Sequence, residues 1–331
     1  MMTQESGKRS PVRREAGKPR RRSNSPSGFV LNVYKEIAWT SHDAVARIRK
    51  ILDTRRVGHA GTLDPLANGV LVVGVGRATK LLQHLVELPK TYRGTLRFGV
   101  RTASGDGGGR LVETGPIPDR DLAALQTVAR EFAGGYEQIP PMVSAVKQKG
   151  KRLYDLAREG KTVQRDPRYV KIERFDLLRY DSPRVDFEVK CGKGTYVRTL
   201  VEDLADRLGT VAAIESLTRI AIGPFTVEDS ARLISRPGSQ RAGLKAAAIP
   251  MGEALAHLPQ IAIREPWVQK LRHGVLPPQS EFELDPALQG SCVRLLGPEE
   301  ELLGLGRIEE GLTQDPIDRL AASVLRLEKV F

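Results

Sequence analysis

Residues 58–69, with the sequence Gly-His-Ala-Gly-Thr-Leu-Asp-Pro-Leu-Ala-Asn-Gly, lead directly into an apolar run at residues 70–75. Such a short apolar run predicts a buried strand. Pro65 disfavours the helical region for Asp64, and the three glycines of the segment permit tight turns. The chain is therefore expected to fold around a core strand that begins at a rigid loop carrying one carboxylate. A loop of this kind is well suited to hold a catalytic group.

Asp64 also has a purely structural interpretation. An aspartate in a loop often bonds only nearby backbone N–H groups, in an Asx-turn, and for an isolated Asp-Pro pair we would prefer that interpretation. Here His59 lies five residues upstream and glycines flank the loop on both sides. These neighbours favour a functional site.

The hydrophobic pattern predicts strands interleaved with helices. Strands are expected at residues 29–34, 70–75, 91–100 and 185–191, and helices at 44–52, 78–88 and 197–208. Thr40, Ser41 and Asp43 are available to cap the first helix. Because several strands alternate between apolar and polar residues, they are half exposed. This pattern indicates an α+β fold around a central mixed or antiparallel sheet with flanking helices.

The composition divides the chain into a tail and two folded parts. Residues 1–27 are rich in Ser, Pro, Gly and Arg and are expected to be a disordered basic tail. Residues 28–248 form the main domain, with an insertion at about 102–165 that holds a Gly-rich turn and a helical stretch near 119–133. Short apolar runs punctuated by Gly and Pro predict a small β-rich domain at residues 249–331.

The charge of the chain indicates a polyanionic partner. The formal net charge is +12, and the eight Lys/Arg and two Glu of residues 1–27 contribute half of it. A basic balance in both tail and body is typical of proteins that neutralise phosphates and release counterions. For the tail, a solubilising extension is as good an interpretation as a specific RNA contact.

The two cysteines, Cys191 and Cys292, lie about a hundred residues apart. This is neither a disulfide framework nor a zinc-ligand spacing, so both are expected to be packing residues in a reducing cytoplasm. No apolar run approaches the ~20 residues of a membrane span, and the basic start lacks the apolar segment of a secretory signal. An organelle transit peptide is the less favoured interpretation of that start.

Five segments together resemble the TruB family of pseudouridine synthases, which isomerise a uridine in the T arm of tRNA. They are the loop at 58–69, Lys90-Thr-Tyr-Arg93, and the segments at 140–147, 193–199 and 216–221. One short motif is weak support, whereas five in the family's order, over roughly residues 28–226, are strong. The resemblance implies a pseudouridine-synthase catalytic domain at 28–248 and, more weakly, a PUA-like RNA-binding domain at 249–331.

The resemblance also implies roles for site residues. Asp64 would be the catalytic carboxylate, and an ordinary Asp, with a pKa near ~3.9, is ionised at neutral pH and needs no activation. Attack at C1′, attack at C6 and a glycal route all stay open. No metal or redox cofactor is required. Tyr92 would stack on the extruded uracil, although its place on the apolar face of a strand also fits a core residue.

Further side chains would complete this site. Arg198 would pair with Asp64 and keep it ionised, unless the pair is merely structural. Tyr196 would project from the sheet's end beside it, and Leu217 would pack against the pocket as a core leucine also would. His59 would brace the space that the flipped nucleotide leaves, and it is not expected to be the general base.

We expect the protein to bind the RNA through its charged phosphates and its A-form shape. The candidates for backbone contact are Lys147, Lys149, Lys151, Arg152 and Lys193. A run of lysines is often only a solvated face, but the neighbouring Gly150 and the expected RNA partner favour contact. Because the target uridine is stacked inside a folded loop, the enzyme must flip it out at a cost of a few kcal/mol. Contacts to phosphates and to the A-form shape would supply this energy.

Some positions depart from the family pattern. Glu36 and Ala38 replace a usual Pro and Gly, Val143 replaces an aromatic residue, and the loop at 103–109 retains only Asp106. These departures affect RNA contacts rather than the reaction.

Three other functions compete with the favoured one. They are a guide-RNA-dependent pseudouridine synthase subunit, a tRNA folding helper with secondary catalysis, and a carboxylate glycosidase, which would need a second acid. The insertion with its segment at 140–147 favours the stand-alone form. We expect a cytoplasmic monomer that binds tRNA without an obligate protein partner.

Overall fold

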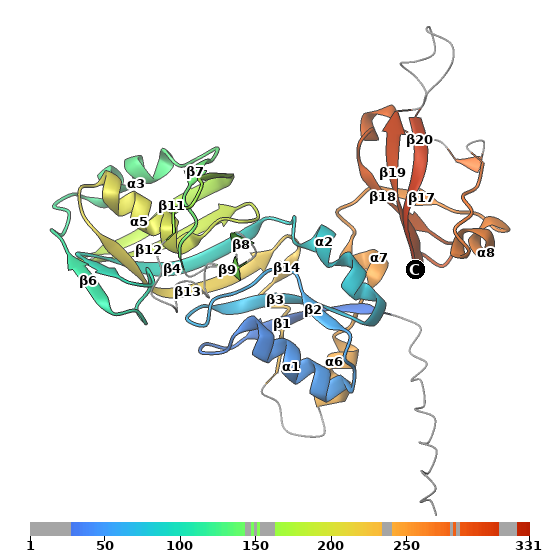
Figure 1. Ribbon diagram of the computed structural model, residues 1–331, viewed down its shortest axis with the longest axis horizontal. Coiled ribbons are helices and arrows are strands. Elements are labelled where there is room, and N and C mark those ends of the chain that lie inside the picture. The colour runs from blue at the N-terminus through green and yellow to red at the C-terminus, as the bar shows by residue number, and fades with distance from the viewer. Residues whose placement is uncertain are drawn as a thin grey trace, which may run out of the picture.

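The computed structural model describes residues 28–142, 147–148, 151–152, 163–233, 240–278, 281–282, 285–310 and 323–331 (Figure 1). The expected tail at 1–27 and residues Val143 and Lys149 lie outside the described residues. The described part consists of a body built on one large sheet and a smaller C-terminal part with its own sheet. In the described residues, no helix is both long enough and apolar enough to cross a membrane.

The large sheet has ten strands, in the order β11-β12-β4-β13-β3-β1-β15, with β14, β16 and β2 paired at its side. Its strands are β1 (Phe29–Lys35), β2 (Val57–His59), β3 (Asn68–Val75), β4 (Lys90–Phe98), β11 (Ile172–Asp181), β12 (Arg184–Cys191), β13 (Ala212–Ile222), β14 (Phe225–Thr226), β15 (Ala231–Arg232) and β16 (Ile249–Pro250). β13 runs parallel to β3 and β1 runs parallel to β15, while the other pairs are antiparallel. The prediction of a mixed sheet in an α+β fold is confirmed.

Helices cover the two halves of this sheet. They are α1 (Ser41–Leu52), η1 (Gly76–Leu81), α2 (Leu82–Leu85), α3 (Leu122–Arg130), α5 (Val197–Arg207), α6 (Gln240–Ala246) and α7 (Met251–Ala254). The apolar faces of α3 and α5 share one buried cluster with β4, β11, β12 and β13. α1 and α6 lie side by side (Figure 1) and share another with β1 and β3.

Local sequence explains where these helices begin and end. At α1, the side chain of Thr40 accepts from the backbone N–H of Asp43, and the Asp43 carboxylate accepts from the backbone N–H of Thr40, a capping box. The helix expected at 78–88 is shorter and partly 3-10, as η1 followed by α2. Pro89 disfavours a helical conformation at Leu88, which ends the segment early.

The insertion contributes small elements beside the large sheet. They are β5 (Val100–Thr102), β6 (Leu111–Thr114), β7 (Tyr136–Gln138), β8 (Lys147–Gln148), β9 (Lys151–Arg152) and β10 (Arg168–Val170). α3 lies in this segment, within the helical stretch expected near 119–133, and Asp121 caps it. The loop at 103–109 returns to the body through a bridge between Asp106 and Ile214.

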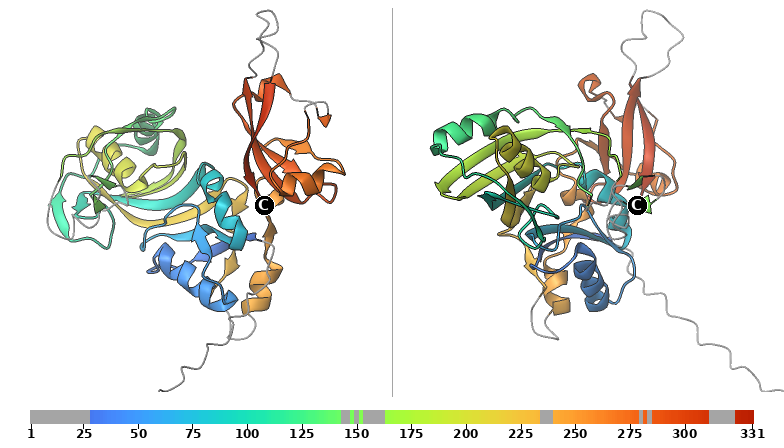
Figure 2. Two further views of the ribbon diagram at one scale, coloured as in Figure 1. Left: turned by 45° about the vertical axis from the view of Figure 1, so that its right-hand side comes forward. Right: turned by 60° about the vertical axis from the view of Figure 1, so that its left-hand side comes forward.

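The C-terminal part is a four-stranded sheet. Its elements are β17 (Gln260–Ala262), α8 (Trp267–Arg272), η3 (Pro286–Leu288), β18 (Cys292–Leu296), β19 (Leu302–Glu310) and β20 (Ser323–Val330). One cluster of apolar side chains lies within this domain. A second joins it to η1, α2, β1 and β3 of the body, so the C-terminal domain packs against the end of the body that carries α2 (Figure 2). β16 pairs with β1, so the chain leaves the large sheet after residue 250.

Candidate active site

The loop that carries Asp64 joins β2 to β3 and is fixed at several points. Gly69 has a φ of +105°, and a Cβ there would lie 2.3 Å from the Arg219 carbonyl oxygen. Only glycine fits this close crossing of two strands. From the helix side, the Ser41 hydroxyl accepts from the Leu63 N–H at 2.8 Å and lies 3.2 Å from the Leu63 carbonyl oxygen. The carboxylate therefore stands on an immobilised backbone.

Arg219, on β13, anchors the same loop. Its guanidinium donates to the carbonyl oxygens of Val70 at 2.8 Å, Thr62 at 3.1 Å and Gly61 at 3.2 Å. The residue is 1% exposed, so it is a buried cation that donates to two carbonyl oxygens of the loop and to one of β3. Arg219 lies in the segment at 216–221, and no role was predicted for it from the sequence. The available signal was its position two residues after Leu217, which the resemblance places at the pocket.

Asp64 and Arg198 form an ion pair, with Arg198 Nε 2.8 Å from Asp64 Oδ2. Their side chains are 6% exposed for the arginine and 40% for the aspartate, so the cation is buried while its partner opens to solvent. Arg198 lies in the first turn of α5, and its Nη1 donates to the Ser104 carbonyl oxygen at 2.7 Å. The guanidinium fixes the direction of the carboxylate through a charge-assisted hydrogen bond.

The pair opens into a cavity of about 250 Å³. Five of the predicted site residues, besides Lys193, line it: Asp64, Tyr92, Tyr196, Arg198 and Leu217. Leu217 and Arg219 are two residues apart on β13 and therefore share a face. Arg219 pairs across the sheet with Tyr92 of β4. Apolar and aromatic walls around one ion pair suit a flat, uncharged ring.

Burial changes the ionisation of groups around this cavity. It raises the pKa of the Tyr92 phenol, which is therefore protonated at neutral pH and can donate a hydrogen bond. Burial, with the nearby Arg219 charge, lowers the pKa of Lys35 and of Lys90 to about 8. Lys90 lines the cavity, and its Nζ donates to the Val86 carbonyl oxygen.

Gln138 supports the aromatic wall, and sequence reasoning missed it. It is 1% exposed. Its side chain accepts from the Tyr196 N–H at 2.8 Å and donates to the Tyr196 carbonyl oxygen at 3.1 Å. The Tyr136 hydroxyl accepts from the same amide and donates to Asp203 at 2.6 Å. This chain of bonds fixes the backbone where α5 begins, beside Arg198.

His59 lies apart from the residues that line the cavity. It is on β2, opposite Val73, and is half-buried. Its Nδ1 is buried without a hydrogen-bond partner among the described residues. Burial and the Arg219 charge lower its pKa, so the ring is neutral at pH 7.

The candidate RNA-contact residues are spread over the surface and the insertion. Lys193 is exposed and pairs with Glu87 at 2.7 Å. Lys147 lies on β8, and Lys151 and Arg152 lie on β9, the two strands of a small hairpin. Lys149 falls outside the described residues.

Known proteins resemble this chain over most of its length. The model of the TruB family pseudouridylate synthase N-terminal domain matches residues 49–197, which include the Asp64 loop. A "tRNA pseudouridine synthase B" of Moorella thermoacetica is 42% identical over 85% of this chain and 94% of its own length. One from Burkholderia lata is 39% identical over 86% of this chain and 87% of its own length.

The solved structures agree on the fold. A crystal structure of a Cbf5-Nop10-Gar1 complex matches 91% of this chain and 83% of its own with a TM-score of 0.69 and 26% identity. The identity to the curated synthases extends over most of both chains. This chain belongs to the TruB family of pseudouridylate synthases.

Proposed function

We propose that this chain converts uridine to pseudouridine in the T arm of tRNA, at position 55, with Asp64 as the catalytic carboxylate. The observation that carries the proposal is the Asp64–Arg198 ion pair at the mouth of a cavity with aromatic and apolar walls. The named activity of relatives about 40% identical supports tRNA as the substrate.

The reaction needs one reactive group and a place that retains the detached base. The N1–C1′ bond of the uridine breaks, the uracil turns, and a C5–C1′ bond forms. The proton lost from C5 is balanced by one gained at N1, so the product is an isomer. Asp64 supplies the single nucleophile or base, and Arg198 holds its carboxylate in place.

The cavity walls would hold the flipped uracil. Tyr92 stacks on the base and takes part in proton transfer, and its raised pKa keeps the phenol protonated until it acts. Tyr196 and Leu217 close the remaining sides of the cavity. His59 braces the RNA after the target nucleotide leaves its stack. His59 does not line the cavity, so it is not the general base in this proposal.

Asp64→Asn tests the catalytic role, because the amide keeps the size of the side chain and loses its charge. Asp181→Asn is the matched control, since that carboxylate is 77% exposed at the sheet edge. We expect Asp64→Asn to bind a tRNA transcript with the affinity of the parent chain and to form no pseudouridine at position 55, while the control stays active. Pseudouridine formed by Asp64→Asn would remove Asp64 from its role.

The competing functions make different predictions for the same experiment. A tRNA folding helper would keep most of its effect on tRNA in Asp64→Asn. A guide-RNA-dependent subunit would be inactive as a purified chain. We expect full turnover with the purified chain and tRNA alone, because the sequence identity to the curated synthases exceeds that to the Cbf5 structure.

We also propose that the protein acts as a monomer and in the cytoplasm.

A further inference from the structure

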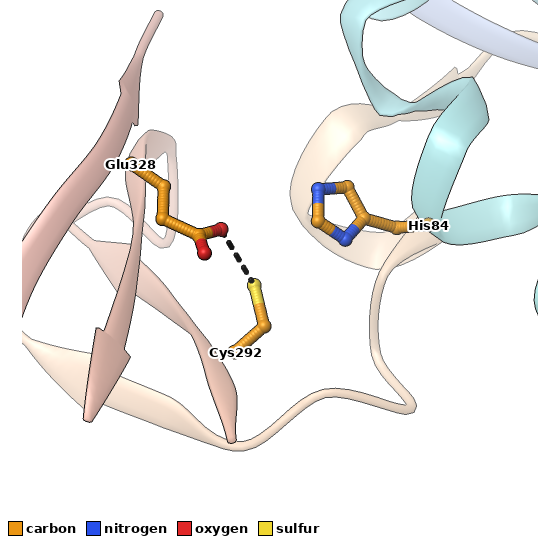
Figure 3. Close-up of side chains that lie close together, drawn as sticks. All are labelled: His84, Cys292 and Glu328. Carbon is orange, nitrogen blue, oxygen red and sulfur yellow. Dashed lines mark hydrogen bonds between the residues drawn. The ribbon is translucent and has the colours of Figure 1, made fainter. Parts of the chain in front are cut away.

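A histidine, a cysteine and a glutamate converge where the C-terminal domain packs against the body. His84 lies on α2, Cys292 begins β18 and Glu328 lies on β20. One ligating atom from each lies within 4.8 Å of those of the other two (Figure 3). The isomerisation proposed above uses none of these side chains. Because these three residues are far apart in the sequence, no metal-binding motif based on residue spacing would identify them.

The seam that holds these three residues is well packed. The Lys80 ammonium donates to the Val330 carbonyl oxygen at 3.4 Å, and that of Lys329 donates to the Lys80 carbonyl oxygen at 3.2 Å. Apolar side chains of η1, α2 and the C-terminal strands form one cluster beneath them, with Cys292 against its edge. The histidine of one domain thus faces the other two side chains across a seam fixed on both sides.

A β-bulge and an arginine direct the glutamate. In the β19–β20 ladder, Leu305 pairs with Lys329 and Gly306 with Leu327, so Glu328 is the extra residue between them. Bulges re-aim side chains in this way. Arg307 Nε donates to Glu328 Oε1 at 2.6 Å. The second oxygen, Oε2, lies 3.7 Å from Cys292 Sγ.

Arg307 is itself held in place. Its Nη1 donates to the Gly290 carbonyl oxygen at 2.7 Å, so the guanidinium that orients Glu328 is anchored to the loop before β18. This is the arrangement of an outer residue that orients a ligating carboxylate, with one oxygen held by Arg307 and the other accepting from the Cys292 thiol.

We propose that His84, Cys292 and Glu328 bind a divalent cation of the zinc class, which joins the two domains. Imidazole nitrogen, thiolate sulfur and carboxylate oxygen are the protein ligands of zinc, and a water fits the fourth tetrahedral position. Thiolate and imidazole select against Mg²⁺ and Ca²⁺, which take oxygen ligands. Binding displaces the thiol proton of Cys292 to solvent, and the thiolate and carboxylate then balance the dication.

The geometry needs only small side-chain movements. Zinc bonds are about 2.0–2.3 Å long, so two ligand atoms on one tetrahedral ion lie about 3.3–3.8 Å apart. The atoms of the three residues lie within 4.8 Å of one another, so they must approach by roughly 1 Å to reach the tetrahedral spacing. Rotation about side-chain bonds is sufficient to bring the atoms together.

The site would connect the C-terminal domain to a wall of the active cavity. α2 ends at Leu85, and the next residue, Val86, lines the cavity and accepts a hydrogen bond from Lys90. A metal held by His84 therefore restrains the segment that carries Val86.

The test uses the full chain without a purification tag, stripped of metal and titrated with Co²⁺ and then with Zn²⁺. We expect one Co²⁺ per chain, with tetrahedral visible bands and a thiolate-to-cobalt charge-transfer band in the near ultraviolet, and displacement of the cobalt by zinc. His84→Ala, Cys292→Ser and Glu328→Gln should each weaken binding by about tenfold or more, since even outer partners of metal ligands contribute about 10–100-fold. Cys292→Ser should abolish the charge-transfer band.

Matched controls separate this site from adventitious binding. Cys191→Ala removes the other thiol, which is buried in the body. His273→Ala removes a histidine at the end of α8, and Glu309→Gln removes an exposed glutamate of β19. All three should bind Co²⁺ as the parent chain does. Absence of the charge-transfer band, or binding that persists in both His84→Ala and Cys292→Ser, would overturn the proposal.

A second readout tests the link between the domains. Zinc should slow amide hydrogen exchange both in residues 82–85 and in β18 and β20, because the ligands come from both sides of the seam. Protection confined to the C-terminal strands would exclude His84 as a ligand and overturn the proposal as well.

Discussion

At the scale of single residues, the site depends on two buried arginines, Arg198 and Arg219, which hold Asp64 and its loop. Arg219→Met leaves the carbonyl oxygens of Gly61, Thr62 and Val70 without their donor. Because buried acceptors without partners are costly, we expect a loss of about 3 kcal/mol or more in the free energy of unfolding. Arg174→Met, at a side chain 55% exposed, should cost below about 1 kcal/mol. Denaturant unfolding of both variants measures the difference. Equal small losses would show that the arginine does not anchor the loop.

The burial of Lys90 makes the free energy of unfolding depend on pH. Burial lowers the pKa of this lysine in the folded chain to about 8 from 10.5. Between these values the unfolded chain holds the proton that the folded chain has lost. The contribution of Lys90 to stability therefore rises as the pH increases from about 8 toward 10.5. We expect the free energy of unfolding of the parent chain, relative to Lys90→Met, to increase between pH 8 and pH 9.5. A constant difference over this range would contradict the burial of a charged amine.

At the scale of elements, the catalytic loop is supported by a helix that contributes no group to the reaction. Ser41→Ala removes the hydroxyl that α1 offers to the Leu63 backbone. We expect a loss of about 1–3 kcal/mol in stability from the unpaired N–H, together with a lower kcat and little change in tRNA affinity. Ser230→Ala, whose hydroxyl bonds the Val227 carbonyl oxygen outside this loop, is the control. Unchanged turnover in Ser41→Ala would mean that the loop holds its shape without the helix.

Elements with a regular pattern were predictable from the sequence, and others were not. The alternation at 91–100 and the apolar run at 70–75 gave β4 and β3, since strand period and burial can be read directly. β13 was not predicted as a strand, because Arg219 and other polar residues interrupt its alternation. Its arginine is buried only because loop carbonyls from another part of the chain surround it. Gln138 was missed for the same reason, as the backbone of Tyr196 that it bonds lies 58 residues away.

At the scale of the whole molecule, the positive charge should dominate tRNA binding. Neutralising phosphates releases counterions, so the logarithm of the association constant should fall steeply and linearly with the logarithm of salt concentration. Lys193 is exposed at the cavity rim. If it contacts a phosphate, Lys193→Ala should lower the magnitude of that slope by about one, while Lys245→Ala, exposed on α6, should leave it unchanged. Fluorescence-detected binding at several salt concentrations measures both slopes. If the tRNA affinity of the parent chain hardly changed with salt concentration, binding through phosphates would be contradicted. Base flipping would then need another source of energy.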